Sequence, residues 1–541
     1  MNKKIKQDVE MAINQGILDN QTLGEALYEI CRKNGERIAL VDDTQRISYA
    51  QLLKEGNRIA ALFYDEGLQK GDNVLLQMPN SVEYVEVLFG LFMLGVRPIL
   101  MLPDHSDTEL LAVARLMEPK AIITTEEELG VTYGRMAQRI KQAIPSIEKI
   151  FLNQNTEYAV SIYKQCRRVM LPFGVELPKP YDIALFLLSG GTTDTPKVIP
   201  RLHTAYLCNA RLSAKRCEVT ETSVYLAALS TSHDYPLCCP GVLGTLLAGG
   251  KCVLSKTASP EEAIEWIEKE SVTFTQLVPV VAAMWVEAMR SESQKPLPVL
   301  RHIEIGAAKL EWPLAEKLKE TFQCKIIQGY GLGEGITCFT KMNDPDEVAF
   351  RTQGTPISSK DQIRIVDENG KEVGIGEAGE IWEKGPYTFY GYYRAPERNK
   401  NLFSEDGFLK TGDKGMLTAD GNLVILGRVK EQINRAGENI IPEEIESFIR
   451  RWEYVSEVAV IGIEDAQLGE AICAVVVKKG EKKGLEDLCA FLSSLKIAHY
   501  KYPDHLVYVD EFPYINVGKV DKKELKKRIA RERKEQWIRL K

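Results

Sequence analysis

The chain has 541 residues, of which 44% are hydrophobic and 27% charged, so it is long enough for two or more globular domains. Its net charge of −7 gives no electrostatic basis for binding nucleic acid. Eleven cysteines without a C-x-x-C pair and six histidines without ligand spacing argue against a disulfide framework and against a transition-metal enzyme. The N-terminus lacks an apolar signal segment and no apolar run suits a bilayer, so we expect a cytoplasmic protein that binds neither nucleic acid nor membrane.

Short apolar segments alternate with helix-like segments through most of the chain, which is typical of an α/β fold. The first predicted elements are a strand at 73–77, a helix at 82–94 and strands at 122–124 and 183–188. Strands at 223–228 and 251–255, a helix at 261–269, a strand at 274–278 and a helix at 279–289 follow.

The pattern changes after about residue 400, where Gly- and Asp-rich turns punctuate short strands. Beyond residue 430 the sequence predicts a compact α+β unit. Its expected elements are a helix at 443–451, strands at 458–463 and 472–478, and a helix at 485–495. We therefore predict two domains, at 1–429 and 430–541.

The apolar run 183–188 predicts a buried parallel strand, and it leads directly into the loop Ser189-Gly-Gly-Thr-Thr-Asp-Thr-Pro-Lys197. Two glycines allow close approach to a ligand, and backbone N–H groups, hydroxyls and a lysine attract anionic oxygens. Pro196 before the lysine excludes a Walker A loop, and Ile336 at the last position of the nearest glycine pattern excludes a dinucleotide fingerprint. The loop suits a triphosphate, and a polar surface turn is the alternative.

This loop resembles the phosphate loop of the adenylate-forming superfamily, which includes acyl-CoA synthetases, luciferases and peptide-synthetase adenylation domains. Further motifs match in the family's order: Tyr330-Gly-Leu-Gly-Glu334, Thr411-Gly-Asp413, Gly427-Arg-Val-Lys430 and Asn516-Val-Gly-Lys519. Within the superfamily the chain is most similar to stand-alone aryl-acid ligases of the 2,3-dihydroxybenzoate–AMP ligase type, through segments such as His233-Asp-Tyr-Pro-Leu237. The resemblance implies a large N-terminal domain of stacked α/β subdomains and a small, mobile α+β C-terminal domain.

The resemblance also implies a reaction. ATP, with Mg²⁺, would activate an aromatic carboxylic acid as aryl-AMP with release of pyrophosphate. The aryl group would then pass to the phosphopantetheine thiol of a separate carrier protein, as in nonribosomal peptide or siderophore synthesis. One alternative is an aryl-CoA ligase that uses coenzyme A, and another is an inactive homologue with a binding role.

Roles for individual residues come from the same resemblance. The nucleotide-binding residues that it implies are Ser189, Gly190, Gly191, Thr192, Thr193, Lys197, Gly306, Ala307, Tyr330, Glu334, Asp413 and Arg428. Among them, Glu334 would bind Mg²⁺, Tyr330 would lie against adenine, and Asp413 and Arg428 would hold the ribose, unless the last two form a plain ion pair.

The implied catalytic residues are Lys519 and His233, and Lys430 is the implied hinge of the mobile domain. A cation between the acid and the α-phosphate would stabilise a transition state in which two anions meet. The alternative for Lys519 is an ordinary surface lysine.

The acid pocket is where the sequence departs from related ligases. The residues implied to line it are Asp234, Tyr235, Cys239, Gly306, Gly329 and Thr337. Asp234 stands where related ligases carry Asn, and a buried carboxylate needs a donor or a cation. An ortho amino group offers N–H donors, whereas an ortho hydroxyl directs its proton to the acid's own carboxylate, so we expect an anthranilate-like acid over salicylate. The alternative is that Asp234 pairs with a protein donor.

The other departures concern the ring's further substituents and the room around it. Cys239 replaces the serine that contacts a 3-hydroxyl in dihydroxybenzoate ligases, which disfavours that group. Gly329 and Thr337 replace aliphatic residues, so we expect a roomier and more polar pocket.

Overall fold

The structure is a computed structural model that describes residues 3–164, 168–189, 197–291, 297, 299–429, 433–435, 438–465, 468–495, 501–515 and 519–539. The chain divides into two compact units. The first comprises Met1–Gln362 and Glu383–Leu409, and the second comprises Ile363–Trp382 and Lys410–Lys541. The expected division into 1–429 and 430–541 stays a prediction.

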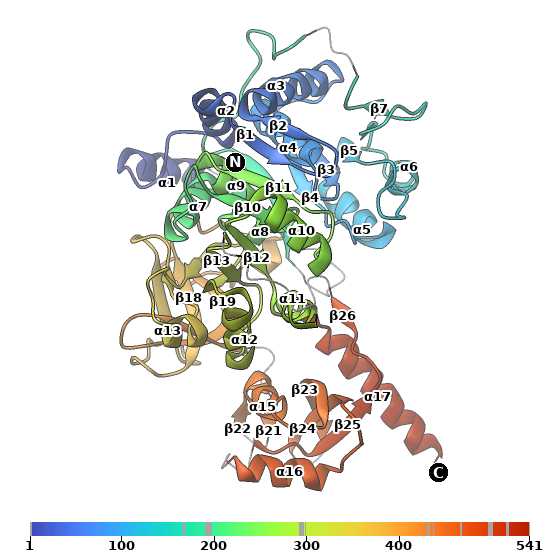
Figure 1. The fold of residues 1–541 in the computed structure, drawn as a ribbon, viewed down its shortest axis with the longest axis vertical. Coiled ribbons are helices and arrows are strands. Elements are labelled where there is room, and N and C mark those ends of the chain that lie inside the picture. The colour runs from blue at the N-terminus through green and yellow to red at the C-terminus, as the bar shows by residue number, and fades with distance from the viewer. Residues whose placement is uncertain are drawn as a thin grey trace. The chain divides into compact units, whose positions relative to one another are not determined.

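A seven-stranded sheet in the first unit has the order β7-β6-β5-β3-β4-β8-β9. Its strands are β3 Asn73–Gln77, β4 Arg97–Leu100, β5 Ala121–Thr124, β6 Lys149–Leu152, β7 Val160–Ser161, β8 Ile183–Ser189 and β9 Lys197–Leu202. The helices packed on it are α3 Tyr49–Asp65, α4 Val82–Leu94, α5 Asp107–Met117 and α6 Tyr133–Ala143. Figure 1 shows these helices around the sheet. Because side chains alternate along a strand, Val74 and Leu76 join the core cluster of α3 and α4, whereas Leu75 joins that of α5 and α6. The predicted strand 73–77 and helix 82–94 are confirmed residue for residue.

The strand that leads into the predicted phosphate loop is buried as predicted, but only one of its two neighbours is parallel to it. β8 pairs in parallel with β4 on one side, but it pairs antiparallel with β9 on the other. The antiparallel register joins Ser189 to Lys197, so the loop connects two neighbouring strands of one sheet. An apolar run shows that a strand is buried, but it does not show the direction of the strand's neighbours.

A second sheet in the first unit has nine strands in the order β16-β15-β14-β13-β12-β10-β11-β1-β2. The strands are β1 Ile38–Val41, β2 Arg46–Ser48, β10 Val224–Ala227, β11 Lys251–Leu254, β12 Phe274–Leu277, β13 His302–Ile305, β14 Lys325–Gly331, β15 Thr337–Phe339 and β16 Thr355–Pro356. Its central strands are parallel, and β2, β15 and β16 are antiparallel. Helices again cover both faces: α10 Pro260–Glu270, α11 Pro279–Ser291, α12 Trp312–Phe322 and α13 Asp346–Arg351 join one core cluster, and α2 Leu23–Asn34, α7 His203–Arg216 and α9 Gly241–Leu247 join the other. The α/β fold class is confirmed.

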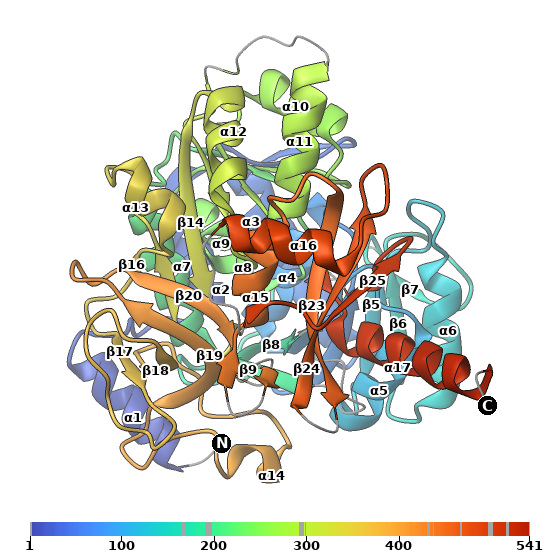
Figure 2. The same cartoon turned by 90° about the horizontal axis from the view of Figure 1, so that it is seen from below.

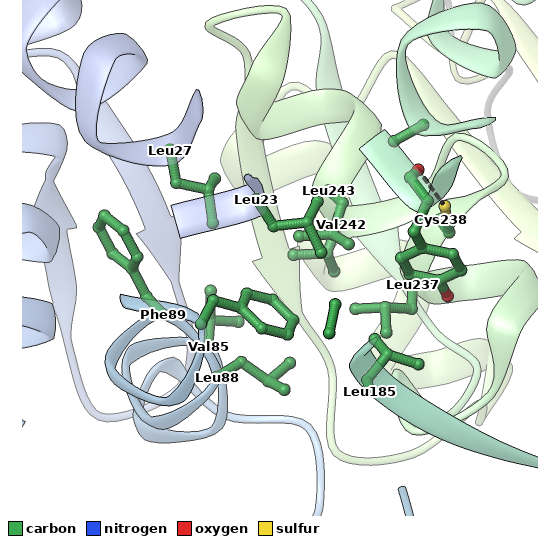
Figure 3. Close-up of a cluster of buried hydrophobic side chains, with 14 of the residues drawn as sticks. Leu23, Leu27, Val85, Leu88, Phe89, Leu185, Leu237, Cys238, Val242 and Leu243 are labelled. Carbon is green, nitrogen blue, oxygen red and sulfur yellow. Dashed lines mark hydrogen bonds between the residues drawn. The ribbon is translucent and has the colours of Figure 1, made fainter. Parts of the chain in front are cut away.

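One continuous core connects the N-terminal helices to the short helix α8, Asp234–Cys238. Figure 3 shows Leu23 and Leu27 of α2 and Phe89 of α4 in this cluster, together with Leu237 of α8. Leu237 is fully buried, so it anchors α8 in the hydrophobic core. The polar residues at the start of α8 therefore stand on a fixed support. The remaining helices of this unit are α1 Lys3–Asn14 and α14 Pro396–Asn399.

The second unit has an α+β architecture. Its strands are β17 Gln362–Val366, β18 Gly379–Lys384, β19 Leu409–Leu417, β20 Leu423–Arg428, β21 Ile433–Arg435, β22 Glu438–Ile440, β23 Val455–Asp465, β24 Gly469–Lys478, β25 His505–Val509, β26 Tyr514–Ile515 and β27 Lys519–Val520. Strands β17 to β20 form one sheet and β21 to β25 another, whose helices are α15 Pro442–Ile449, α16 Leu485–Ser494 and α17 Lys522–Arg539. Figure 2 shows these helices beside β23, β24 and β25. Val458 and Val460 pack with α15 and α16, whereas Ala459 and Ile461 pack with α17 on the opposite face. The predicted α+β unit is confirmed.

Within the described part of the chain, no helix is both long and apolar enough to cross a membrane. All the cysteines that the structure describes are free, and all but Cys489 are buried.

Candidate active site

Strands β8 and β9 position the two ends of the predicted phosphate loop. Ser189 ends β8 and Lys197 begins β9, opposite each other in the sheet. Residues 190–196, which include Gly190, Gly191, Thr192 and Thr193, lie outside the described residues.

Lys197 and Glu334 meet at one aromatic side chain, Tyr392. The Lys197 ammonium lies 5.7 Å from the centre of the Tyr392 ring, and the Tyr392 hydroxyl donates a 2.7 Å hydrogen bond to Oε1 of Glu334. The backbone N–H of Phe389 also donates to the Glu334 carbonyl, at 2.7 Å. The structure thus brings together the lysine predicted for phosphate and the glutamate predicted for Mg²⁺, from segments more than 130 residues apart in the sequence.

The predicted adenine-binding residues follow the ends of two strands. Gly306 follows β13, and a Cβ at this position would lie only 2.8 Å from the ring of Tyr235, so the close approach of that ring requires glycine. Ala307 has φ +62°, a left-handed conformation that is uncommon for a residue with a side chain. Tyr330 is partly buried near the end of β14. The left-handed backbone conformation of Ala307 is of a sparsely populated kind that is frequent at ligand sites.

The start of α8 carries the predicted acid-recognition residues. His233 caps the helix, and its Nδ1 accepts from the backbone N–H of Tyr235 at 3.3 Å. Asp234 accepts a 2.6 Å hydrogen bond at Oδ1 from the hydroxyl of Tyr206, and the thiol of Cys239 lies 4.0 Å from Oδ2. The protein donor considered as an alternative therefore exists, but it engages only one of the two oxygens strongly.

Tyr206 is itself held by a buried arginine, Arg201. The guanidinium lies 5.3 Å from the centre of the Tyr206 ring, and its Nη1 donates to the Gly333 carbonyl at 2.7 Å. Arg201 is only 2% exposed, and its Nε and Nη2 find no hydrogen-bond partner among the described residues. Burial and the charge of Asp234 raise the pKa of Tyr206 well above its usual value, so the phenol stays a donor. Three successive contacts, Asp234 to Tyr206, Tyr206 to Arg201 and Arg201 to Gly333, connect the predicted acid-recognition residue to the loop that carries Glu334.

Sequence reasoning missed Tyr206, Arg201 and Tyr392. A charged residue inside the mostly apolar strand β9 was the one available signal for Arg201. Tyr206 and Tyr392 gave none, since a tyrosine on a helix or in a loop is ordinary.

Thr337, which is predicted to line the acid pocket, belongs to a set of polar contacts. The Thr337 hydroxyl donates to Oδ1 of Asn209 at 3.3 Å, and Nδ2 of Asn209 lies 3.6 Å from the Cys239 sulfur. The extra room that was expected at Gly329 is not present in the structure. A Cβ on Gly329 would lie 2.4 Å from the ring of Phe339, its partner across the β14–β15 pair, so that ring already fills the space.

The second unit holds the remaining predicted residues. Asp413 and Arg428 are opposite each other on β19 and β20, with Nε of Arg428 2.7 Å from Oδ1 of Asp413. The carboxylate is buried and the guanidinium is half exposed. Lys519 begins β27 with its side chain exposed, and Lys430 lies outside the described residues.

Lys197 and Glu334 meet at Tyr392, and Asp234 is linked through Tyr206 and Arg201 to Gly333, the residue before Glu334. The family model described as "AMP-binding enzyme" matches residues 27–393, and the model of its C-terminal domain matches residues 444–519. The chain therefore belongs to the AMP-binding enzyme family of adenylate-forming acid–AMP ligases, which bind ATP. The resemblance seen in the sequence is confirmed.

Curated relatives match over nearly their whole length. Pyochelin synthase PchD of Pseudomonas aeruginosa is 40% identical, covering 97% of this chain and 95% of the relative. The 2,3-dihydroxybenzoate-AMP ligase of Bacillus subtilis is 38% identical, covering 95% of both chains. The salicyl-AMP ligase / salicyl-S-ArCP synthetase of Mycobacterium tuberculosis is 35% identical, covering 95% of this chain and 92% of the relative. The solved apo structure of Mycobacterium smegmatis MbtA has a TM-score of 0.74 at 36% identity, covering 96% of this chain and 97% of that one.

Proposed function

We propose that this enzyme activates a small aromatic acid bearing an ortho amino or hydroxy group. In the first step a carboxylate oxygen attacks the α-phosphorus of ATP, the bond to the bridging oxygen breaks and pyrophosphate leaves. In the second step a thiol attacks the acyl carbon, AMP leaves and the thiol proton is released. The names of the relatives, which include 2,3-dihydroxybenzoate and salicyl ligases, support the aromatic class.

The observation that carries the proposal is the link between the acid pocket and the nucleotide loop. Asp234 is joined through Tyr206 and Arg201 to Gly333, which adjoins Glu334. A pocket that merely bound an aromatic molecule would need no such connection. An acid held by this chain and a triphosphate held near Glu334 would be neighbours, as an attack on the α-phosphorus requires.

Glu334 fits a divalent cation. One of its oxygens accepts from Tyr392, and carboxylate and phosphate oxygens together are the ligands that Mg²⁺ prefers. Such an ion would neutralise charge on the triphosphate and the leaving pyrophosphate. We therefore propose Glu334 as its protein ligand, with Lys197 and the hydroxyls of Thr192 and Thr193 holding the β- and γ-phosphates.

Asp234 supports an ortho substituent that donates a hydrogen bond. An ionised carboxylate accepts only, and Oδ2 faces no donor stronger than the Cys239 thiol among the described residues. An amino group supplies two N–H donors, so we favour an anthranilate-like acid, with an ortho hydroxy acid as the second choice. Cys239, in place of serine, disfavours a 3-hydroxyl.

Residues 430–541, the C-terminal part of the second unit, are proposed to act as the mobile lid. Lys519 would stabilise the developing charge between the acid and the α-phosphate, and His233 would assist from α8. Asp413 and Arg428 would hold the ribose, and Lys430 would be the hinge. The proposed acceptor is a carrier protein, as the name salicyl-S-ArCP synthetase records for one relative, with coenzyme A as the alternative. Buried, reduced cysteines suit work in the cytoplasm.

Exchange of labelled pyrophosphate into ATP tests the proposal. The acids to compare are benzoate, salicylate, 2,3-dihydroxybenzoate, anthranilate and 3-hydroxyanthranilate. We expect exchange to be fastest with an ortho-substituted acid, and Asp234→Asn to shift the preference from amino toward hydroxy acids. Lys519→Ala should abolish exchange yet still consume aryl-AMP that is supplied with the thiol. Absence of exchange with every acid would refute the proposed function.

A further inference from the structure

Tyr392 occupies a built position beside the proposed nucleotide site. Its backbone N–H donates to Oδ1 of Asn399, and its carbonyl accepts from Nδ2 of the same residue, both at 2.9 Å. Its ring packs edge-on against Phe389 at 5.0 Å, and the whole residue is only 8% exposed. A side chain fixed at both its backbone and its ring has little rotational freedom.

The two functional parts of this side chain face different partners. The hydroxyl donates to Oε1 of Glu334, while the ring lies beneath the ammonium of Lys197. The guanidinium of Arg398 also lies 5.9 Å from the ring centre. A hydrogen bond from the phenol fixes the orientation of the carboxylate, and the negative face of the ring attracts the two cations.

We propose that Tyr392 is a positioning residue that aligns Glu334 for the divalent cation and Lys197 for the triphosphate. This inference rests on the proposed function of these two residues. Because the phenol donates to Oε1, the Glu334 carboxylate is held in one orientation for the proposed metal. The ring keeps the flexible Lys197 side chain close to Glu334 before the nucleotide arrives, which lowers the entropic cost of binding.

Two substitutions separate the two parts of the side chain. Tyr392→Phe removes the hydroxyl and keeps the ring, whereas Tyr392→Leu removes both. Tyr393→Phe is the matched control, because it deletes the hydroxyl of the neighbouring tyrosine. The ring of Tyr393 packs on Phe186, with 4.9 Å between the ring centres. Thermal denaturation of all three variants establishes that they are folded.

Calorimetric binding of α,β-methylene-ATP, with and without Mg²⁺, is a readout that needs no turnover. We expect Tyr392→Phe to lose about 10-fold or more of the affinity that Mg²⁺ adds, with metal-free binding unchanged, because a lost partner of a metal ligand commonly costs that much. Tyr392→Leu should in addition weaken metal-free binding by about 3-fold through loss of the contact with Lys197. In pyrophosphate exchange, Tyr392→Phe should need correspondingly more Mg²⁺ for half-maximal rate.

The inference is overturned if Tyr392→Phe matches Tyr393→Phe in both measurements, or if it lowers only the melting temperature. It is also overturned if both Tyr392 variants weaken metal-free binding equally. Failure of the proposed function is a separate result, because it would leave the unaltered protein without pyrophosphate exchange for any acid.

Discussion

Replacing Tyr206 by phenylalanine tests whether the contacts that link Asp234, Tyr206 and Arg201 contribute to recognition of the substrate's ortho group. The phenol is fully buried and donates a 2.6 Å hydrogen bond to the Asp234 carboxylate. Tyr206→Phe keeps the ring beside Arg201 and removes only that bond. Oδ1 of Asp234 would then lose its donor, and the carboxylate would be free to rotate.

The magnitude follows from the bond that is lost. A hydrogen bond to a charged group contributes about 1.5–3 kcal/mol, which corresponds to roughly 10- to 150-fold in rate or affinity. We expect kcat/KM for the preferred ortho-substituted acid to fall by this factor. Unsubstituted benzoate offers nothing to Asp234, so its kcat/KM should change by less than about 3-fold. The ratio of kcat/KM for the ortho-substituted acid to kcat/KM for benzoate should therefore fall by nearly the same factor as kcat/KM for the ortho-substituted acid.

Pyrophosphate exchange at saturating ATP, over a range of each acid, measures both constants. Phe339→Leu, a change beside Gly329 on the β14–β15 pair, serves as a control for general loosening of the pocket. An equal fall for benzoate and for the ortho-substituted acids would show that Tyr206 is only structural. An unchanged selectivity would refute the role of Asp234 as the reader of the ortho group.

Three further predictions concern stability, the pocket and the lid. Burial raises the pKa of Glu86 to about 8 from 4.5, so its contribution to stability is full below pH 4.5 and is lost as the pH rises toward 8. Glu86→Gln should therefore raise the melting temperature at pH 8.5 by about 3–5 °C, with little effect at pH 4.5, as scanning calorimetry can measure. Gly306→Ala would press on the ring of Tyr235 and should raise KM for the acid about 10-fold or more in exchange assays, while an unchanged KM would show that the ring simply moves aside. Lys430→Pro should slow both adenylation and thioester formation in single-turnover assays, and normal thioester formation would remove the hinge assignment.

Local patterns made much of this molecule predictable. The strand 73–77 and the helix 82–94 were predicted with correct ends, and the structure shows Ser81 as the N-cap of that helix. The family resemblance singled out Lys197, Glu334, Asp413 and Arg428, and the structure brings them together as two pairs of neighbours.

What escaped prediction depends on contacts between distant segments. Tyr392 meets Glu334 across 58 residues, and Tyr206 meets Asp234 from a different helix. The ring of Phe339 fills the space beside Gly329 only because the register of β14 and β15 places them opposite each other. No local pattern records a register or a packing partner, so residues that position others remain invisible in the sequence.

The antiparallel pairing of β8 and β9 has an electrical consequence. In many phosphate-binding loops a helix begins at the loop, and its dipole gives a permanent positive field. Here the next helix among the described residues, α7, begins after the six residues of β9, about 20 Å of strand beyond Lys197. Attraction for a polyanion then depends more on the loop's own donors and on side-chain charges such as Lys197, and salt screens the contribution of those charges. Nucleotide affinity in this enzyme should accordingly fall more steeply with ionic strength than in enzymes whose phosphate loop is followed directly by the N-terminus of a helix.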